Sequence, residues 1–523
     1  MMVLKHEDEM ISIKTANIGD RIESGGSFGT VKYIGLIEGY TNIWLGVDWD
    51  YSDRGKHNGS VNGVSYFCTR TPTSGSFIRP EKVHLGRSVM KAITSRYGQM
   101  DDEAAAKLTE AELYSIQKTM NAPFLEFVGF DEVASKQSNF QKLEVINLRL
   151  QNVSNIDGQV GLRELCPHVV ELDVSKNLFT EWTTIFNICL QLELLKWLNV
   201  SENIMGEMPT DYGYYRFPKL KSLICGTMRL DWDTVLELGR VYPFVDELRA
   251  PLNGITTLDT PEGLFPNLAV LDLEGNPIGG WEEVCKLAAI PRLEHLNVEN
   301  TGITRIYFQK SNMFPNLKKL VISCNRIGDW ESIGELDKLQ CLEDLRFLKN
   351  PILESETYAT CIQLIIARIG NLQVLNGAVL RSDERKGAEY DYIKKYGLEW
   401  LSVQSDAERK LQFIRQHNRY ETLIEKYGTP DESELAAKQT VIKVSLIEVL
   451  FVHNEKSRTK KLPPTILVQK LIMLAQKLFA LSSRPTLKYV SGLASEIEIE
   501  LNDEGKELGF YSVQDGDKII VTL

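Results

Sequence analysis

The sequence has no long apolar run. No stretch reaches the roughly 18–20 apolar residues that a membrane-spanning helix needs, and residues 1–9 contain no apolar core of the signal-peptide kind. The eight cysteines are scattered and form no Cys-x-x-Cys pair. This spacing argues against a zinc site and favours buried, reduced thiols in a cytoplasmic protein. We therefore expect no membrane contact, no bound metal and no cofactor.

The sequence also lacks an excess of basic residues. It has 59 Lys and Arg against 71 Asp and Glu, which gives a formal net charge of −12. Nucleic-acid-binding proteins favour basic surfaces, so we expect no nucleic-acid partner. The 43% hydrophobic and 25% charged content is ordinary for a globular protein, and 523 residues predict several domains.

A segment rich in glycine and aromatic residues lies between residues 25 and 83, centred on Gly55-Lys56-His57-Asn58-Gly59. Its β-branched and aromatic residues predict short strands, and its glycines suit tight turns. A basic residue in a tight loop beside aromatic side chains suits an extended acidic peptide that ends in a carboxylate. Nucleotide binding is not favoured, because no kinase motifs follow and His57 stands where a P-loop requires Ser or Thr.

This segment resembles the CAP-Gly domain, a small all-β barrel that binds acidic tails ending in an aromatic residue. Three family elements follow in order: Trp44-x-Gly46-Val47, Gly63-x-x-Tyr66-Phe67 and Gly75-x-Phe77-x-Arg79. The family loop reads Gly-Lys-Asn-Asp-Gly, so His57 and Asn58 depart from it. That departure concerns the affinity and the preferred peptide, and it leaves the implied fold unchanged.

The resemblance implies a groove that holds a peptide tail. Its carboxylate-binding loop comprises Lys56, His57, Asn58 and Gly59. The candidate groove walls and the supporting charge are Phe28, Trp49, Phe67, Phe77 and Arg79.

An internal repeat fills the middle of the chain. The pattern L-x-x-L-x-L-x-x-N recurs at intervals typical of leucine-rich repeats, with one strand and one inward row of leucines per unit. The copies start at Leu143, Val169, Leu195, Leu220, Val245, Leu268, Leu293, Leu317 and Leu342, with a partial copy at Leu372. The asparagines of the pattern are predicted to be structural, through hydrogen bonds to backbone in the turns.

Alternate residues on the repeat strands face the concave surface, which solenoids use to bind proteins. The candidate contact residues are Asp173, Asn199, Arg249, Asp272, Asn297 and Arg346. Residues 382–390 resemble the cap of cytoplasmic leucine-rich arrays, helical periodicity continues to about residue 427, and Pro430 ends it. Before the array, we expect a helix near 101–120 and an apolar capping run at 124–128.

The C-terminal segment alternates strand, helix and strands. Residues 441–447 have the period-two apolar spacing of a half-buried strand, and residues 468–478 carry a helical apolar stripe. With the final Asp515-Gly516-Asp517 turn, the order resembles a ubiquitin-like domain of the β-grasp fold. We therefore predict five segments: CAP-Gly (10–86), linker and N-terminal cap (87–140), repeats with C-terminal cap (141–390), helices and linker (391–439), and ubiquitin-like (440–523).

This domain order resembles the family of tubulin-folding cofactor E. The resemblance implies a cytoplasmic, cytoskeleton-associated chaperone, not an enzyme, which binds α-tubulin and works with the other tubulin-folding cofactors (B, C and D). Its implied role is assembly and dissociation of the α/β-tubulin heterodimer. The ubiquitin-like segment implies a further docking partner, either a cofactor or a component of the proteasome or ubiquitin pathway.

Two alternatives remain open from the sequence. A microtubule-associated adaptor could use the same groove on polymer tails, although such adaptors usually carry long coiled coils and basic Ser-rich flanks, which are missing here. A GTPase-activating protein is the second alternative. It is disfavoured because no compact acid–base, metal or nucleophile constellation appears in the sequence.

Overall fold

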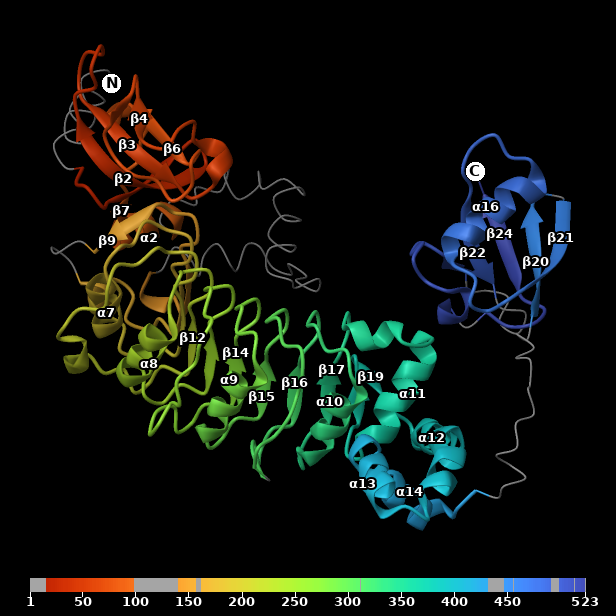
Figure 1. Ribbon diagram of the computed structural model, residues 1–523. Coiled ribbons are helices and arrows are strands. Elements are labelled where there is room, and N and C mark those ends of the chain that lie inside the picture. The colour runs from red at the N-terminus through yellow and green to blue at the C-terminus, as the bar shows by residue number, and fades with distance from the viewer. Residues whose placement is uncertain are drawn as a thin grey trace. The chain divides into compact units, whose positions relative to one another are not determined.

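The computed structural model describes residues 16–97, 140–156, 161–310, 312–430, 446–454, 456–490, 498–511 and 513–522. The chain divides into two compact units, Met1–Pro430 and Asp431–Leu523. Figure 1 shows both units and the order of their elements along the chain. All eight cysteines are free, and four of them are buried. No helix among the described residues is both long and apolar enough to cross a membrane.

The N-terminal part of the first unit is an all-β domain. Its four-stranded antiparallel sheet has the order β1 (Arg21–Ser24), β2 (Ser27–Gly35), β3 (Trp44–Trp49), β6 (Gly75–Ile78). A separate hairpin pairs β4 (Ser60–Val61) with β5 (Val64–Ser65). The predicted CAP-Gly fold is confirmed, with an open sheet and a hairpin in place of one closed barrel.

The repeats form one long parallel sheet. The first nine of its eleven strands have three residues each and the last two have two, and each strand pairs with the next strand of the sheet. In order, the strands are β8 (Val145–Asn147), β10 (Glu171–Asp173), β11 (Trp197–Asn199), β12 (Ser222–Ile224), β13 (Glu247–Arg249), β14 (Val270–Asp272), β15 (His295–Asn297), β16 (Lys319–Val321), β17 (Asp344–Arg346), β18 (Val374–Leu375) and the antiparallel β19 (Ala378–Val379). Every full copy of the predicted pattern therefore yields one strand, which begins two residues after the start of the copy.

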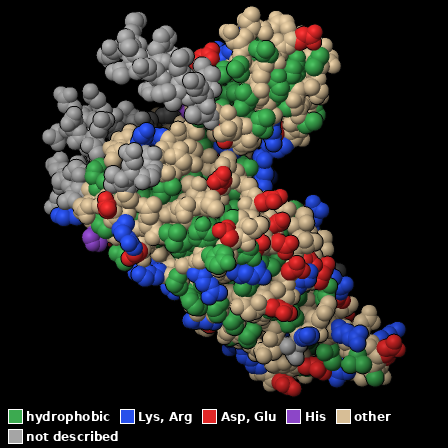
Figure 2. All heavy atoms as spheres, turned by 90° about the vertical axis from the view of Figure 1, so that its left-hand side faces the viewer, with side chains coloured by type: hydrophobic (Ala, Val, Ile, Leu, Met, Phe, Trp, Pro, Cys, Tyr) green, Lys and Arg blue, Asp and Glu red, His purple; other side chains and the backbone are tan. Residues whose placement is uncertain are grey.

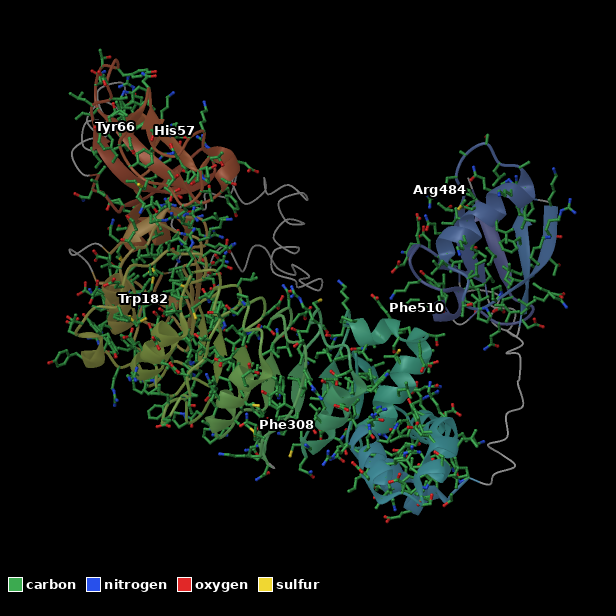
Figure 3. All side chains as sticks on the ribbon, in the orientation of Figure 1. His57, Tyr66, Trp182, Phe308, Arg484 and Phe510 are labelled. Carbon is green, nitrogen blue, oxygen red and sulfur yellow. The ribbon has the colours of Figure 1, made fainter. Side chains whose placement is uncertain are left out.

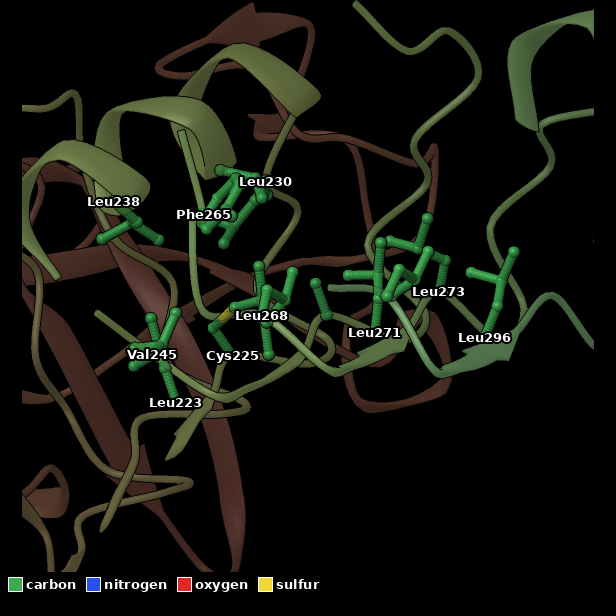
Figure 4. Close-up of a cluster of buried hydrophobic side chains, with 14 of the residues drawn as sticks. Leu223, Cys225, Leu230, Leu238, Val245, Phe265, Leu268, Leu271, Leu273 and Leu296 are labelled. Atoms are coloured by element: carbon green, nitrogen blue, oxygen red, sulfur yellow. The ribbon is translucent and has the colours of Figure 1, made fainter. Parts of the chain in front are cut away.

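The core of the array is a continuous stack of aliphatic side chains. The middle residue of each three-residue strand is buried, and Leu248, Leu271 and Leu296 are all about 1% exposed. Adjacent rungs pack against one another, as Figure 4 shows for Leu223, Leu268 and their neighbours. A single rung has no partner for its apolar edge, so the array gains its stability from stacking.

Helices follow the strands in the chain and lie on the side of the repeats opposite the parallel sheet (Figure 1). They are α6 (Leu162–Leu165), α7 (Trp182–Gln191), α8 (Trp232–Val241), α9 (Trp281–Cys285), α10 (Trp330–Glu335) and α11 (Tyr358–Arg368). Tryptophan is the first residue of α7, α8, α9 and α10. Three of these rings are at most 4% exposed, whereas Trp330 is only half-buried.

Both ends of the array are covered. At the N-terminal end, β7 (Arg87–Ser88) pairs with β9 (Val153–Asn155), and α2 (Val89–Tyr97) packs into the same core. At the C-terminal end lie α12 (Ser382–Val403), α13 (Ala407–Gln416) and α14 (Tyr420–Tyr427), as the helical periodicity predicts. Arg385 of α12 donates to carbonyls of Ile366, Ile369 and Leu372, which closes the last rung. The capping segments predicted at 101–120 and 124–128 lie outside the described residues.

The second unit is a β-grasp domain. Its sheet has the order β21 (Lys456–Leu462), β20 (Ile447–His453), β24 (Lys518–Thr522), β22 (Thr486–Val490), β23 (Glu498–Glu500). Strands β20 and β24 are parallel, and α16 (Val468–Phe479) packs its apolar stripe on the sheet. The predicted ubiquitin-like fold is confirmed. The first described strand begins at Ile447, and residues 441–445 of the predicted strand lie outside the described residues.

Eight short 3₁₀ helices complete the described elements. They are η1 (Ser52–Arg54), η2 (Pro80–Lys82), η3 (Phe140–Lys142), η4 (Tyr212–Tyr214), η5 (Lys286–Ala289), η6 (Leu336–Lys338), η7 (Pro351–Glu354) and η8 (Leu508–Tyr511). Two of them, η1 and η2, flank the candidate site described next.

Candidate peptide-binding site

The loop from Gly55 to Gly59 is held against the start of β6. The backbone N–H groups of Lys56 and His57 both donate to the carbonyl of Gly75, at 2.7 and 3.1 Å, and the N–H of Gly75 donates to His57 O at 2.7 Å. Both flanking glycines are required. A Cβ at Gly55 would lie 2.1 Å from Thr73 O, and Gly59 has φ +95° with Phe67 O 2.0 Å from an added Cβ. The loop is therefore fixed before any peptide arrives.

The His57 ring is part of this fixed loop. Its Nδ1 accepts a hydrogen bond from the N–H of Gly59 at 3.0 Å, so the proton of the neutral ring sits on Nε2. Burial, and then the charge of Lys56, lower the pKa of His57 from its ordinary value. His57 therefore offers one neutral N–H donor at neutral pH, beside the exposed ammonium group of Lys56.

Aromatic rings gather next to the loop. Phe77 makes edge contacts with Tyr33, Tyr66 and Phe67 at centroid distances of 5.3–6.1 Å, and it lies 5.3 Å from the His57 ring. His57 and Tyr66 are labelled in the β domain in Figure 3. The rings come from β2, the loop, the β5–β6 connection and β6, so the sheet and loop together build one aromatic surface.

A cavity of 370 Å³ opens beside this surface. Three cations, Arg54, Lys56 and Lys82, line it together with rings that include Tyr40, Trp44 and Phe77. Among the described residues, no carboxylate lines this cavity. The electrostatic character of the pocket is therefore opposite to the net charge of −12 of the whole chain.

The structure places the predicted groove residues in three groups. Lys56, His57 and Phe77 line the cavity, and Phe67 touches the rings of His57 and Phe77 while packing over Gly46. Phe28 is a core residue, 6% exposed, and the prediction of Phe28 as an open groove wall is corrected accordingly. Trp49 is also buried, 0% exposed, and the Arg54 guanidinium covers its ring at 4.6 Å, but Trp49 still belongs to the lining of the cavity.

The remaining three predicted residues support the site from outside the cavity. Arg79 stacks on the Trp44 ring at 3.8 Å and donates to Thr41 O, so it holds one wall in place. Asn58 is exposed and accepts from Ser60 N, and Gly59 makes the turn. The prediction missed lining or cluster residues, namely Tyr33, Tyr40, Arg54, Tyr66 and Lys82. Tyr66 belongs to the family element Gly63-x-x-Tyr66-Phe67, and for the other four their aromatic or basic character was the only signal in the sequence.

The six concave-face candidates are the last residues of their strands, opposite the buried middle positions. Four of them also have a local structural role. The side-chain oxygens of Asp173, Asn199, Asp272 and Asn297 accept the N–H two residues on, at 2.8–3.0 Å, and so cap the turn after each strand. Arg249 pairs with Glu247, and Arg346 forms no ion pair within the described residues.

The structure shows a second row on the same face. From β10 to β17 it comprises the first residue of each strand, in register: Glu171, Trp197, Ser222, Glu247, Val270, His295, Lys319 and Asp344. Acidic and basic side chains are interspersed over the array in Figure 2. The pKa of Asp272 is raised by burial, and that of Glu274 by burial and by the charges of Asp272 and Glu299. The ionised forms of these two carboxylates are therefore disfavoured in this part of the face.

The fold and the site define a modular CAP-Gly protein: a CAP-Gly β domain, a leucine-rich-repeat array and a ubiquitin-like unit. The CAP-Gly domain model matches residues 18–83, and the leucine-rich repeat model matches residues 255–402. Tubulin-specific chaperone E of Bos taurus is 36% identical over 96% of this chain and 98% of its own length. That of Danio rerio is 37% identical with the same coverage.

The chain belongs to the tubulin-specific chaperone E family. This membership rests on relatives that are aligned along almost the whole chain. A solved structure, the C-terminal ubiquitin-like domain of mouse tubulin-specific chaperone e, is 28% identical and covers 16% of this chain and 91% of its own, with a TM-score of 0.15.

Proposed function

We propose that the chain is a non-catalytic tubulin chaperone that binds α-tubulin at two places. The groove beside Lys56 holds the acidic, aromatic-ended tail of α-tubulin, and the concave face of the repeats holds the folded body. The chain works in the cytoplasm and at the cytoskeleton with the other tubulin-folding cofactors B, C and D. Together they assemble and dissociate the α/β-tubulin heterodimer.

One observation carries this proposal: a cavity with three cations, aromatic walls and no carboxylate, on a chain that is acidic overall. Lys56 supplies a charge-assisted hydrogen bond to a tail carboxylate, and His57 adds a neutral N–H donor. The rings of Trp44 and Phe77 give an aromatic tail residue an apolar surface. Acidic side chains further along the tail are attracted to Arg54 and Lys82.

The array adds a second, independent contact. Two rows of side chains in register give a broad face of mixed charge. A basic patch on a folded partner would stabilise the ionised carboxylates of Asp272 and Glu274. Joining a tail site to a body site on one chain raises the overall affinity through effective concentration. The ubiquitin-like unit serves as a separate docking module for a second cofactor or for a component of the proteasome or ubiquitin pathway.

Lys56→Ala tests the groove. We expect binding of an acidic, aromatic-ended peptide to weaken by about 1–3 kcal/mol, because one charge-assisted hydrogen bond is lost. Calorimetric titration of the full chain measures the change, and thermal unfolding shows that the fold is intact. The matched control is Lys32→Ala, an exposed lysine of β2 that does not line the cavity. Equal affinity for the wild type and Lys56→Ala would reject the groove assignment.

A purification from cytosol separates the chaperone from the adaptor. A chaperone retains unassembled tubulin and folding cofactors, whereas an adaptor retains polymer and plus-end proteins. Recovery of polymer proteins without cofactors would favour the adaptor.

A further inference from the structure

A second cleft lies at the C-terminal end of the array, where the last repeats meet the helical cap. It consists of two neighbouring cavities of 540 and 800 Å³, and both are lined by Arg305 and Glu331. The first also reaches α11 and α12 through Arg368 and Tyr396. The second reaches Phe308, which Figure 3 labels at the edge of the array. The cleft shares no residue with the CAP-Gly groove.

Arg368 is the central residue of the first cavity. It is 2% exposed, and its guanidinium carbon lies 5.4 Å from the Trp330 ring centroid and 5.2 Å from that of Tyr392. Nη1 donates to the carbonyl of Gln416, but Nε is buried and has no hydrogen-bond partner within the described residues. No described carboxylate forms an ion pair with Arg368. A buried cation with a free donor requires an explanation beyond packing.

Most acidic side chains of the cleft already have partners. Glu331 pairs with Arg305 and Glu335 with Lys338, while Asp329 caps α10 through Ser332 N at 2.8 Å. Asp337 accepts the N–H of Gly370 at 2.7 Å.

Four charged groups of the cleft have no ion-pair partner within the described residues: the cations Arg368 and Arg415, and the anions Asp329 and Glu399. Burial and the charge of Arg368 lower the pKa of His417 to about 3, so this ring is neutral and does not add to the cations. These four charges cancel in number. Glu399 and Arg415 are exposed to solvent and Asp329 caps α10, so Arg368 is the buried charge of the cleft that lacks a counter-ion.

The second cavity contains an orphan acceptor. Asn418 donates through Nδ2 to Gly334 O at 3.1 Å and to Asp337 at 3.2 Å, which fixes the orientation of its amide. Its Oδ1 is buried and accepts no hydrogen bond within the described residues. The cleft thus presents a free cationic donor in one cavity and a free acceptor in the next, with the rings of Trp330 and Tyr396 along the first.

We propose that this cleft binds an extended peptide segment of a partner protein that carries an acidic side chain beside an apolar one. The carboxylate pairs with Arg368, a main-chain N–H of the peptide donates to Asn418 Oδ1, and the apolar side chain packs on Trp330 and Tyr396. A peptide fits better than a small carboxylate because the free donor and the free acceptor lie in two successive cavities. This site is independent of the proposed tail groove.

The test uses the full chain with Lys56→Ala, which removes the main cation of the CAP-Gly groove. The probe is a fluorescein-labelled peptide with Glu-Glu-Phe-Gly repeated twice and an amidated C-terminus, so that no terminal carboxylate is offered. We expect saturable binding by fluorescence anisotropy, and loss of binding when Gln replaces every Glu of the probe. Trp330 emission changes on binding of the unlabelled peptide, and Trp330→Phe removes that change.

Two variants locate the site. Arg415→Glu is an exposed charge reversal, and we expect it to weaken binding about tenfold, whereas Lys394→Glu, on an exposed part of α12 outside both cavities, leaves binding unchanged. Arg368→Gln abolishes binding if thermal unfolding shows an intact fold. If that variant unfolds, the affinity of Arg415→Glu and the affinity for the Gln peptide still test whether the cleft binds an acidic peptide.

Three results would overturn the proposal. They are no binding of the probe, equal binding of the Glu and Gln peptides, or equal loss in Arg415→Glu and Lys394→Glu. Succinate that displaces the probe at equal carboxylate concentration would assign the cleft to small dicarboxylates, and this too would reject a peptide as the ligand.

Discussion

His57 replaces the Asn of the CAP-Gly loop pattern and still takes part in the hydrogen bonds of the loop. The CAP-Gly loop pattern has Asn in this position, and here the imidazole accepts the Gly59 N–H and keeps its proton on Nε2. A second proton on Nδ1 would face the Gly59 N–H and break the hydrogen bond that shapes the loop. The neutral ring is therefore the form that fits the fold, which agrees with the direction of its pKa shift.

The lowered pKa of His57 predicts that the stability of the fold depends on pH. Because the folded-state pKa of His57 is lowered, the unfolded chain takes up this proton first as the pH falls. The stabilising contribution is full above the unfolded pKa of about 6.5 and is lost as the pH falls through the folded value. NMR titration of the imidazole, assigned by comparison with His57→Asn, should give a pKa below 6.5. A value at or above 6.5 would contradict the loop geometry.

Within the CAP-Gly unit, the sequence indicated the loop better than the groove walls. Glycine spacing identifies a tight turn, because few residues tolerate φ +95° or the contacts at Gly55. It does not tell which of many aromatic rings face the core. Five of the six residues of β3 are buried, so alternation gives no information on Trp49. The pairing register of β2 shifts between Val31 and Tyr33, and Tyr33 lies in the aromatic cluster. No pattern of residues in the sequence predicts this shift.

At the scale of the element, the repeat asparagines form a ladder. Asn276 Nδ2 donates to the carbonyls of Ala250 and Leu273 at 2.9 Å, while Oδ1 accepts the N–H of Asn253 and of Ile255. One side chain thus joins two rungs and supplies partners to four backbone groups. The prediction of a structural role is confirmed, and it was accessible because the repeat places Asn at a fixed distance from each strand.

Asn276→Ala should destabilise the array by about 3 kcal/mol, since several buried backbone groups lose their partner. Denaturant unfolding followed by far-UV circular dichroism measures the difference. The matched control is Asn155→Ala, an exposed asparagine whose amide bonds only the neighbouring Ser154 side chain, and it should change stability by less than about 0.5 kcal/mol. Equal effects of the two substitutions would refute the ladder.

At the scale of the whole molecule, the first unit contains both the CAP-Gly domain and the array, and β7 and α2 follow the CAP-Gly domain directly in the chain. Residues 87–97, predicted as part of a linker and cap, form β7 and α2 and contribute Val89, Ala92 and Ile93 to the array core. Arg87 donates through Nε to Gln151 O at 2.8 Å. Sequence periodicity missed this because β7 has only two residues. A fixed connection favours simultaneous binding of tail and body.

The most direct test of the two-site account is a thermodynamic cycle on intact tubulin. The affinity of the full chain is measured for tubulin with and without the α-tubulin tail, using the wild type and Lys56→Ala. We predict that tail removal weakens wild-type binding, that Lys56→Ala weakens it to a similar degree, and that the two changes together cost little more than either alone. Two results would contradict the account: additive losses of affinity in the cycle, or a wild-type affinity that is the same with and without the tail.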